Sequence, residues 1–244
     1  MSVARLAQLL AERQPAVALT GAGVSTESGI PDFRSPTGIW ARYDPMEYAT
    51  IDAFRSDPRK VWEFYGLRLR VLADAQPNTA HLALAEFERR GLLRAVVTQN
   101  VDTLHERAGS QDVVEVHGSI RTAVCLVDGT RMPRAEVVRL VDEFGAPPCP
   151  ACGAILKPDV VMFGELLPTR EIDRATQLVR EARLLLVVGS TLEVWPVAGL
   201  PHETLAAGGV VAIVNRGPTA FDSRAALKLD AGAGETLQAV VDAL

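Results

Sequence analysis

Short apolar runs recur along the chain with the length and composition of buried parallel strands. They cover residues 16–19, 95–98, 113–116, 184–188 and 210–214, with a weaker run at 227–229. Helical patterns, with apolar residues every three or four positions, lie between most of these runs. The helical patterns cover residues 1–13, 59–73, 79–90, 170–182, 197–207 and 234–244. Strands that alternate with helices predict an α/β fold built on a doubly wound, Rossmann-like parallel sheet.

Two stretches interrupt this alternation. Residues 30–53 show little apolar periodicity and predict a long loop, which in a compact domain usually has a function. Residues 121–159 contain all three cysteines, a tandem proline pair and several turn residues. We interpret them as a small cysteine-bearing module inserted into a single domain. The Rossmann-like core of that domain would cover about residues 1–120 and 160–244.

Glycines and polar residues stand where the predicted strands end, at Gly21, Gln99, His117, Gly189 and Asn215. In a doubly wound sheet, ligands bind at the carboxyl ends of the strands. The pattern therefore predicts one ligand site, to which several strands contribute.

The segment after the first strand, residues 21–34, is typical of a phosphate-binding turn. A strand that ends in glycines lets backbone N–H groups approach a pyrophosphate closely. Gly21 and Gly23 fit the first two positions of the fingerprint G-x-G-x-x-G, but Thr26 stands where the third glycine belongs. The segment ends with a carboxylate, an aromatic ring and a guanidinium, on Asp32, Phe33 and Arg34. A turn alone would not need these three groups.

Charge and composition narrow the possible functions. The 244 residues carry a formal net charge of −5. This charge argues against a general binder of nucleic acid or anionic membrane, and it is compatible with a basic partner such as a lysine-bearing peptide. We find no apolar run of membrane-spanning length, no signal-peptide core and no even set of cysteines for a disulfide framework. We expect a soluble cytoplasmic protein.

The four histidines differ in their positions. His81 and His105 lie within helical patterns, where we interpret them as hydrogen-bonded structural residues, and His202 is expected at the surface. His117 ends a strand, precedes a glycine and lies on the ligand side of the predicted sheet. Its position alone fits a general base and a structural histidine equally well.

Six segments have a known counterpart in sequence and in order. They are residues 21–34 (GAGVSTESGIPDFR), 98–105 (TQNVDTLH), 116–119 (VHGS), 160–165 (VVMFGE), 189–192 (GSTL) and 214–215 (VN). These segments resemble the motifs of the sirtuins, the NAD-dependent protein lysine deacylases. The resemblance extends from near residue 16 to near residue 230, which is almost the whole chain.

The resemblance implies that NAD is consumed as a co-substrate. In that family the acyl oxygen of a modified lysine displaces nicotinamide, and the acyl group leaves as O-acyl-ADP-ribose. His117 matches the histidine that deprotonates a ribose hydroxyl of NAD after nicotinamide has left. Two alternatives are a sirtuin-like mono-ADP-ribosyltransferase or NAD glycohydrolase, and a catalytically silent NAD sensor. The intact His117 and the intact segment 160–165 favour deacylation.

The resemblance also implies a set of contacts to NAD. Asn100 and Asp102 would hold the nicotinamide end and Gln99 the ribose, while Ser190 and Asn215 would contact the adenosine half. From the residues alone, these side chains could equally solvate loops and cap helices. The implied set is Gly21, Ala22, Gly23, Thr26, Asp32, Phe33, Arg34, Gln99, Asn100, Asp102, Gly189, Ser190, Thr191, Asn215 and Arg216.

By the same resemblance, residues 160–163 would pair as a strand with an extended peptide that carries the acyl-lysine. The implied substrate contacts are Val160, Val161, Met162, Phe163 and Gly164. Sirtuins that remove succinyl, malonyl or glutaryl groups carry Y-x-x-R, which Tyr65 and Arg68 match, and a small upstream alanine, which Ala49 resembles. A phenol and a guanidinium on one helix side can bind a carboxylate. We therefore expect a deacetylase that also acts as a desuccinylase or demalonylase; the alternative is an amphipathic helix with Arg68 in water.

The cysteines suggest a metal site. Cys149 and Cys152 have the C-x-x-C spacing of a metal knuckle, and many sirtuins carry a second such pair near position 125. Here Cys125 stands alone, but Asp128 could give a fourth, oxygen ligand because zinc accepts carboxylate. We expect a structural zinc held by these four residues. The alternative is a module with free thiols that has lost its metal.

Overall fold

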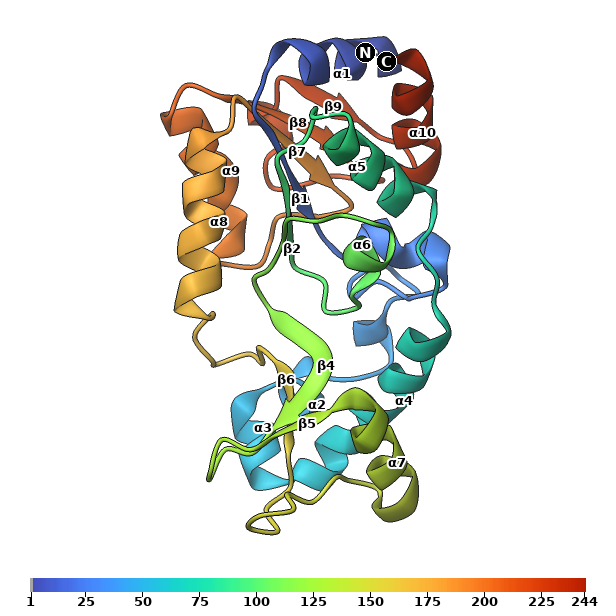
Figure 1. Cartoon of the computed structure of the whole chain (residues 1–244), viewed down its shortest axis with the longest axis vertical. Helices are drawn as coiled ribbons and strands as arrows, with labels where there is room; N and C mark the ends of the chain where they lie inside the picture. Colours follow the sequence, from blue (N-terminus) through green and yellow to red (C-terminus); the bar gives the residue numbers. More distant parts are fainter. Residues whose placement is uncertain (1) are drawn as a thin grey trace.

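A six-stranded parallel sheet forms the upper part of the molecule (Figure 1). The computed structural model describes residues 2–244. The strands are β1 (Ala16–Thr20), β2 (Ala95–Thr98), β3 (Val113–Glu115), β7 (Leu184–Val188), β8 (Val210–Val214) and β9 (Leu227–Leu229). They lie in the order β3-β2-β1-β7-β8-β9, and every neighbouring pair is parallel. The chain order reverses between β1 and β7, which confirms the predicted Rossmann-like fold.

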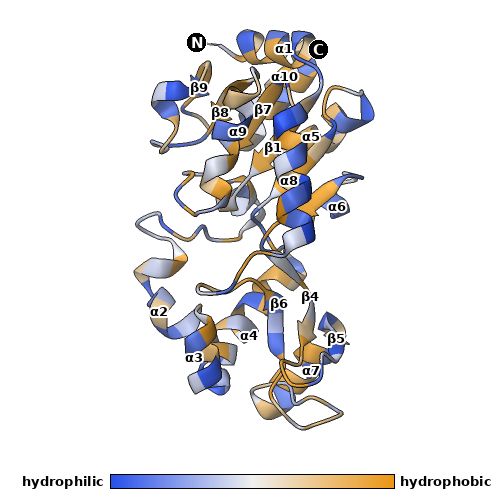
Figure 2. Ribbon diagram, turned by 90° about the vertical axis from the view of Figure 1, so that its left-hand side faces the viewer, coloured by the Kyte–Doolittle hydropathy of each residue, from blue (hydrophilic) through white to orange (hydrophobic). Residues whose placement is uncertain are grey.

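Helices cover both faces of this sheet. One face carries α1 (Val3–Glu12), α5 (Thr79–Arg89) and α10 (Ala233–Ala243), and the other carries α8 (Thr169–Glu181) and α9 (Leu200–Ala206). Along β1, Ala16 and Ala18 face the first group while Val17 and Leu19 face the second, with the two-residue period of a strand. Because both faces are covered, the strands are apolar throughout and could be recognised in the sequence. Figure 2 shows these hydrophobic strands beside the more hydrophilic α8.

A second, antiparallel sheet lies below the first, in the order β5-β4-β6 (Figure 1). Its strands are β4 (Gly118–Val124), β5 (Arg131–Pro133) and β6 (Lys157–Val160), and it packs with α7 (Arg134–Phe144) and α4 (Pro58–Asp74). The indole of Trp62 on α4 donates a hydrogen bond of 2.7 Å to the carbonyl of Leu156. These elements share an apolar core of their own. The bounds of an inserted module at 121–159 stay a prediction.

The prediction of a loop over residues 30–53 is wrong from residue 39 onward. That part contains η2 (Ile39–Ala41), α2 (Pro45–Tyr48) and the start of α3 (Ile51–Ser56). These helices are too short to show a helical period. Side-chain caps stabilise α2 and α3, since Asp44 accepts from the N–H of Met46 and Thr50 accepts from the N–H of Ala53. The remaining short helices are η1 (Ala22–Ser28), α6 (Leu104–Arg107), η3 (Val197–Gly199) and η4 (Asp222–Arg224). Within residues 2–244, every helix is too short or too polar to cross a bilayer.

Candidate active site

A cavity of about 1180 Å³ lies at the carboxyl edge of the six-stranded sheet, where it meets the second sheet. This volume exceeds that of a typical single-ligand pocket, so the cavity has room for two ligands. The NAD residues expected from the sequence that line it are Gly21, Ala22, Gly23, Thr26, Asp32, Phe33, Arg34, Gln99, Asn100, Gly189, Ser190, Thr191, Asn215 and Arg216. His117 and the substrate residues Ala49, Tyr65, Arg68, Val160, Val161, Met162, Phe163 and Gly164 line it as well. Asp102 instead lies buried behind the lining.

Three glycines, Gly21, Gly23 and Gly189, form the floor of the cavity, which we call the glycine floor. A Cβ on Gly21 would lie 2.8 Å from the carbonyl oxygen of Gly189, and one on Gly23 would lie 2.8 Å from the Gly189 Cα. The N–H of Gly23 donates to the carbonyl of Gly189 at 2.9 Å, and Gly189 has a left-handed φ of +61°. Only glycine fits this approach of two loops. A floor made of bare backbone suits the pyrophosphate of a dinucleotide.

Five side chains next to the glycine floor form a buried polar cluster, of which only Asn100 also lines the cavity: Ser25, His81, Asn100, Asp102 and His105. Ser25 Oγ donates to Asp102 Oδ2 at 2.7 Å and accepts from Asn100 Nδ2 at 3.0 Å. The rings of His81 and His105 lie 4.8 Å apart, and each has a hydroxyl partner at one nitrogen. Both histidines therefore have the hydrogen-bonded positions expected of them. Ser25 was not identified from the sequence, because its partners lie 56 to 77 residues away.

The two clustered histidines make the stability of the fold depend on pH. Burial lowers the pKa of His81 to about 4 and that of His105 to about 3. Both are neutral in the folded protein, whereas the unfolded chain takes up their protons near pH 6.5. Because the unfolded state binds more protons between pH 6.5 and about 4, the free energy of unfolding falls as the pH falls. We expect a loss of roughly 3 kcal/mol from pH 7 to pH 5 in urea denaturation. The free energy of unfolding of the His105→Gln variant should fall less over this pH range. A fall equal to that of the unaltered protein would show that His105 does not cause the pH dependence.

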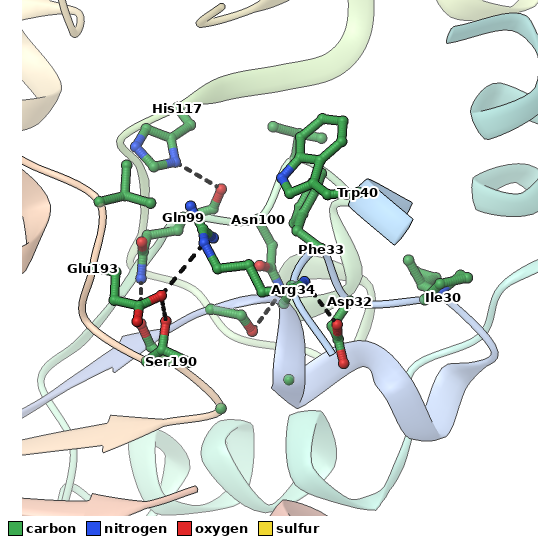
Figure 3. A pocket seen from close by; sticks show the side chains of 18 of the residues that line it. Ile30, Asp32, Phe33, Arg34, Trp40, Gln99, Asn100, His117, Ser190 and Glu193 are labelled. Carbon is green, nitrogen blue, oxygen red and sulfur yellow. Dashed lines mark hydrogen bonds and ion pairs between the residues drawn. The ribbon is translucent and has the colours of Figure 1, made fainter. Parts of the chain in front are cut away.

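His117 is half-buried at the junction of the two sheets, just before β4 (Figure 3). Its Nδ1 lies 3.1 Å from the carbonyl oxygen of Gln99. A carbonyl only accepts, so Nδ1 carries the proton and Nε2 is left as the basic nitrogen. Burial lowers the pKa of His117, and the bond to Gln99 opposes this in part. The imidazole is therefore neutral at neutral pH and able to accept a proton at Nε2.

An ion pair joins two loops that line the cavity. Arg34 lies 3.4 Å from Glu193, in the loop after β7, as Figure 3 shows. Asp32 folds the first of these loops, because its Oδ1 accepts from the N–H groups of Arg34 and Ser35. Asp32 thus has a structural function besides its place in the lining. Glu193 was not identified from the sequence, where an exposed glutamate carries no sign of such a partner.

Side-chain amides organise the loops that follow β2, β7 and β8. Gln99 Nε2 donates to Ser190 Oγ at 2.9 Å, across the end of β1, which lies between β2 and β7. Asn215 Nδ2 donates to the carbonyl of Arg216 at 2.9 Å, within the loop after β8. Both Ser190 and Asn215 lie in loops, so the capping alternative does not hold for them.

The opposite end of the cavity is formed by Ala49, Tyr65 and Arg68. The guanidinium of Arg68 lies 4.9 Å from the ring centre of Phe33 and 5.6 Å from that of Phe64. Within residues 2–244 it has no carboxylate within 4.0 Å and no hydrogen-bond acceptor. Burial raises the pKa of Tyr65 to about 12, so its phenol stays protonated. This end therefore offers a cation and a hydrogen-bond donor in an aromatic surrounding.

Residues 160–164, which we call the substrate segment, line the cavity beside His117. The N–H of Val161 donates to the His117 carbonyl at 2.8 Å. The N–H of Phe163 donates to the carbonyl of Ala49 at 2.9 Å, and its carbonyl accepts from Ile51 at 3.0 Å. Both backbone groups of Phe163 are thus paired within the chain. This corrects the expectation that residues 160–163 all pair with a peptide, because Phe163 is left to contact one through its side chain.

Comparison with known proteins agrees with this geometry. Residues 21–196 match the sequence model of the Sir2 family. The chain belongs to the Sir2 family. It is 46% identical to an NAD-dependent protein deacetylase of Caldivirga maquilingensis over 98% of this chain and 92% of the relative. It is 43% identical to an NAD-dependent protein deacylase of Pyrococcus furiosus, over 97% of this chain and 96% of the relative. These similarities confirm the sirtuin resemblance.

Solved Sir2 structures confirm the fold. A Sir2 variant with a deacetylated p53 peptide and 3′-O-acetyl ADP-ribose superimposes with a TM-score of 0.95 at 39% identity, covering 99% of this chain and 98% of the other. A Sir2 complex with a p53 peptide and NAD⁺ superimposes with a TM-score of 0.92 at 38% identity, with the same coverage of both chains. The lower part of this Sir2-family chain corresponds to structure shared by these proteins, since the match covers nearly every residue.

The Sir2-family chain also brings together its four expected metal ligands. One ligand atom from each of Cys125, Asp128, Cys149 and Cys152 lies within 4.8 Å of the others. Cys125 Sγ and Cys152 Sγ are 3.5 Å apart, and Asp128 Oδ2 lies 3.4 Å from Cys149 Sγ. Tetrahedral zinc with bonds of about 2.0–2.3 Å requires ligand separations of roughly 3.3–3.8 Å. The cluster therefore fits a closed, structural zinc site.

We expect elemental analysis of protein purified without chelator to find about one zinc per chain. Asp128→Ala should weaken zinc retention against a chelator, because one of four ligands is lost. Asp142→Ala, an acidic surface residue on α7, is the matched control and should retain zinc. Folded protein free of metal would refute the site.

Proposed function

We propose that this protein is an NAD-dependent protein-lysine deacylase. The observation that carries the proposal is that His117 lines the same cavity as the glycine floor and Arg68, with Nε2 free to accept a proton. Relatives named NAD-dependent protein deacetylase and deacylase support it. The Sir2 structure with a p53 peptide and NAD⁺ supports a peptide partner, which we propose is an acyl-lysine in a protein.

In the proposed reaction, different residues of the cavity have different functions. NAD supplies the anomeric carbon that the acyl oxygen attacks as nicotinamide leaves. Asn100, held by Ser25 and the Gly21 carbonyl, would orient the nicotinamide end. His117 Nε2 would accept a proton from a ribose hydroxyl, whose oxygen then bonds to the acyl carbon. Acyl-lysine, NAD and one water would give lysine, nicotinamide and O-acyl-ADP-ribose.

We also propose that the preferred acyl group carries a carboxylate, as succinyl and malonyl groups do. Arg68 lines the cavity and has no acidic partner among residues 2–244, so a ligand carboxylate would complete its hydrogen bonding. The protonated phenol of Tyr65 can donate to the same carboxylate. Ala49 has only a methyl side chain and leaves room for the longer group. An acetyl group would leave the guanidinium without a partner.

The test is to incubate the protein with NAD and peptides of one sequence whose lysine is acetylated, succinylated, malonylated or free. Mass spectrometry should find deacylated peptide and O-acyl-ADP-ribose in equal amounts, only when NAD is present. Cleavage of NAD without loss of the acyl group would instead indicate an NAD glycohydrolase. Transfer of ADP-ribose to the peptide would indicate a transferase. If neither NAD nor peptide changes, the proposal fails.

A further inference from the structure

We infer that Lys157 and Glu165 are positioning residues: their ion pair holds the substrate segment in the conformation that binds the acyl-lysine peptide. The inference rests on the proposed function. It concerns two residues to which the proposed function gives no part; Glu165 lines the cavity and Lys157 does not. It predicts a selective effect on the peptide.

Lys157 is a buried cation with all of its donors in use. Its side chain is 5% exposed, at the start of β6. Nζ donates to the carbonyls of Pro158 at 3.0 Å and Val160 at 2.6 Å, and it lies 3.0 Å from Glu165 Oε2. An ammonium has three N–H donors, and these are its three acceptors. A buried charge persists in a fold only when it is paired in this way.

Glu165 holds the other end of the same segment. The Oε2 atom that pairs with Lys157 also accepts from the N–H of Met162 at 2.8 Å. The N–H of Glu165 donates to the Met162 carbonyl at 3.0 Å, and Gly164 has a φ of +88°. This is the geometry of a type II turn with glycine at its third position. One ion pair therefore fixes the carbonyl of Val160 and the N–H of Met162, on either side of Val161.

The segment held in this way connects the two functional parts of the substrate side. Through Val161 it is bonded to His117, and through Phe163 to Ala49 and Ile51. The glycine floor lies in the segments that follow β1 and β7 and has no hydrogen bond to the substrate segment. Loosening the Lys157–Glu165 pair should therefore disturb the peptide side of the cavity and leave the NAD side in place.

We expect Lys157→Met and Glu165→Gln each to raise the KM for an acyl-lysine peptide roughly 10- to 100-fold, the scale of a small displacement of a binding segment. The KM for NAD should change less than about twofold. Lys157→Arg keeps a cation with donors and should recover most of the peptide affinity. Lys60→Met is the matched control, because Lys60 forms an exposed pair with Glu47 at 2.8 Å and should leave both constants unchanged.

Peptide binding without turnover, measured by fluorescence anisotropy, keeps this test separate from the proposed function. An unaltered protein that binds acyl-lysine peptide without deacylating it would refute the proposed function alone. If Lys157→Met does not fold, Glu165→Gln retains the shape of the side chain and carries the test. Equal losses for peptide and NAD, or an unchanged peptide affinity in folded variants, would overturn the inference. So would an unaltered protein that binds no acyl-lysine peptide.

Discussion

Replacing His117 with alanine should reduce deacylation by at least about two orders of magnitude, the usual contribution of a general base. His117 is the cavity-lining histidine whose bond to Gln99 leaves Nε2 as the free basic nitrogen. Without it, the ribose hydroxyl keeps its proton and captures the acyl carbon slowly. NAD binding should persist, because the glycine floor and the polar cluster are untouched. Initial rates with an acylated peptide, and calorimetric titration with NAD, measure the two quantities.

The matched control for this variant is His202→Ala, which removes an exposed histidine on α9 and should leave the rate unchanged. In the unaltered protein, the deacylation rate should fall as the pH is lowered through the range in which His117 becomes protonated. Because burial lowers the pKa of His117, that fall should begin below pH 6.5. A His117→Ala protein that deacylates at the parent rate would exclude this histidine as the base.

Arg68→Met should reduce desuccinylation by roughly tenfold to a hundredfold and leave deacetylation nearly unchanged. A carboxylate paired with Arg68 gains about 1.5–3 kcal/mol from charge-assisted hydrogen bonds, and methionine removes that gain while it fills similar space. The measurement is kcat/KM for succinyl- and acetyl-lysine forms of one peptide. Tyr65→Phe should shift the ratio in the same direction by a smaller amount, because one neutral donor is lost.

Arg70→Met provides the control for Arg68. Arg70 lies on the same helix, but it is exposed and pairs with Asp142 at 2.6 Å on the outer surface. Both activities should survive its replacement. Equal losses of both activities in Arg68→Met would show that Arg68 supports the fold rather than the acyl group. If the unaltered enzyme removes no succinyl group, the proposed acyl preference is wrong and the protein is an ordinary deacetylase.

The sheet and the place of the site could be predicted because both depend on local sequence. Every residue of β1 and β7 is buried, so these strands are continuous apolar runs. The polar residues that follow them meet at one edge in any parallel sheet. The helices α2 and α3 were missed, since four and six residues cannot show a period and only their caps mark them.

Contacts between distant residues could not be predicted in this way. Asp102, expected to hold the nicotinamide end, is buried and accepts a hydrogen bond from Ser25, which lies 77 residues earlier. Lys157 is buried although lysine is almost always exposed. Its carboxylate partner and its carbonyl acceptors come together only once β6 and the following turn have formed. The sequence near Lys157 shows the charge and not its surroundings.

The glycine floor has a consequence for the entropy of binding. A pocket lined by long side chains must immobilise them when a ligand arrives, at about 0.5–1.5 kcal/mol for each. Gly21, Gly23 and Gly189 have no rotamers to lose, and their backbones are already fixed against one another. A pyrophosphate on this floor therefore meets groups that are preorganised. The side chains that remain to be ordered lie at the rim, where Arg34 pairs with Glu193.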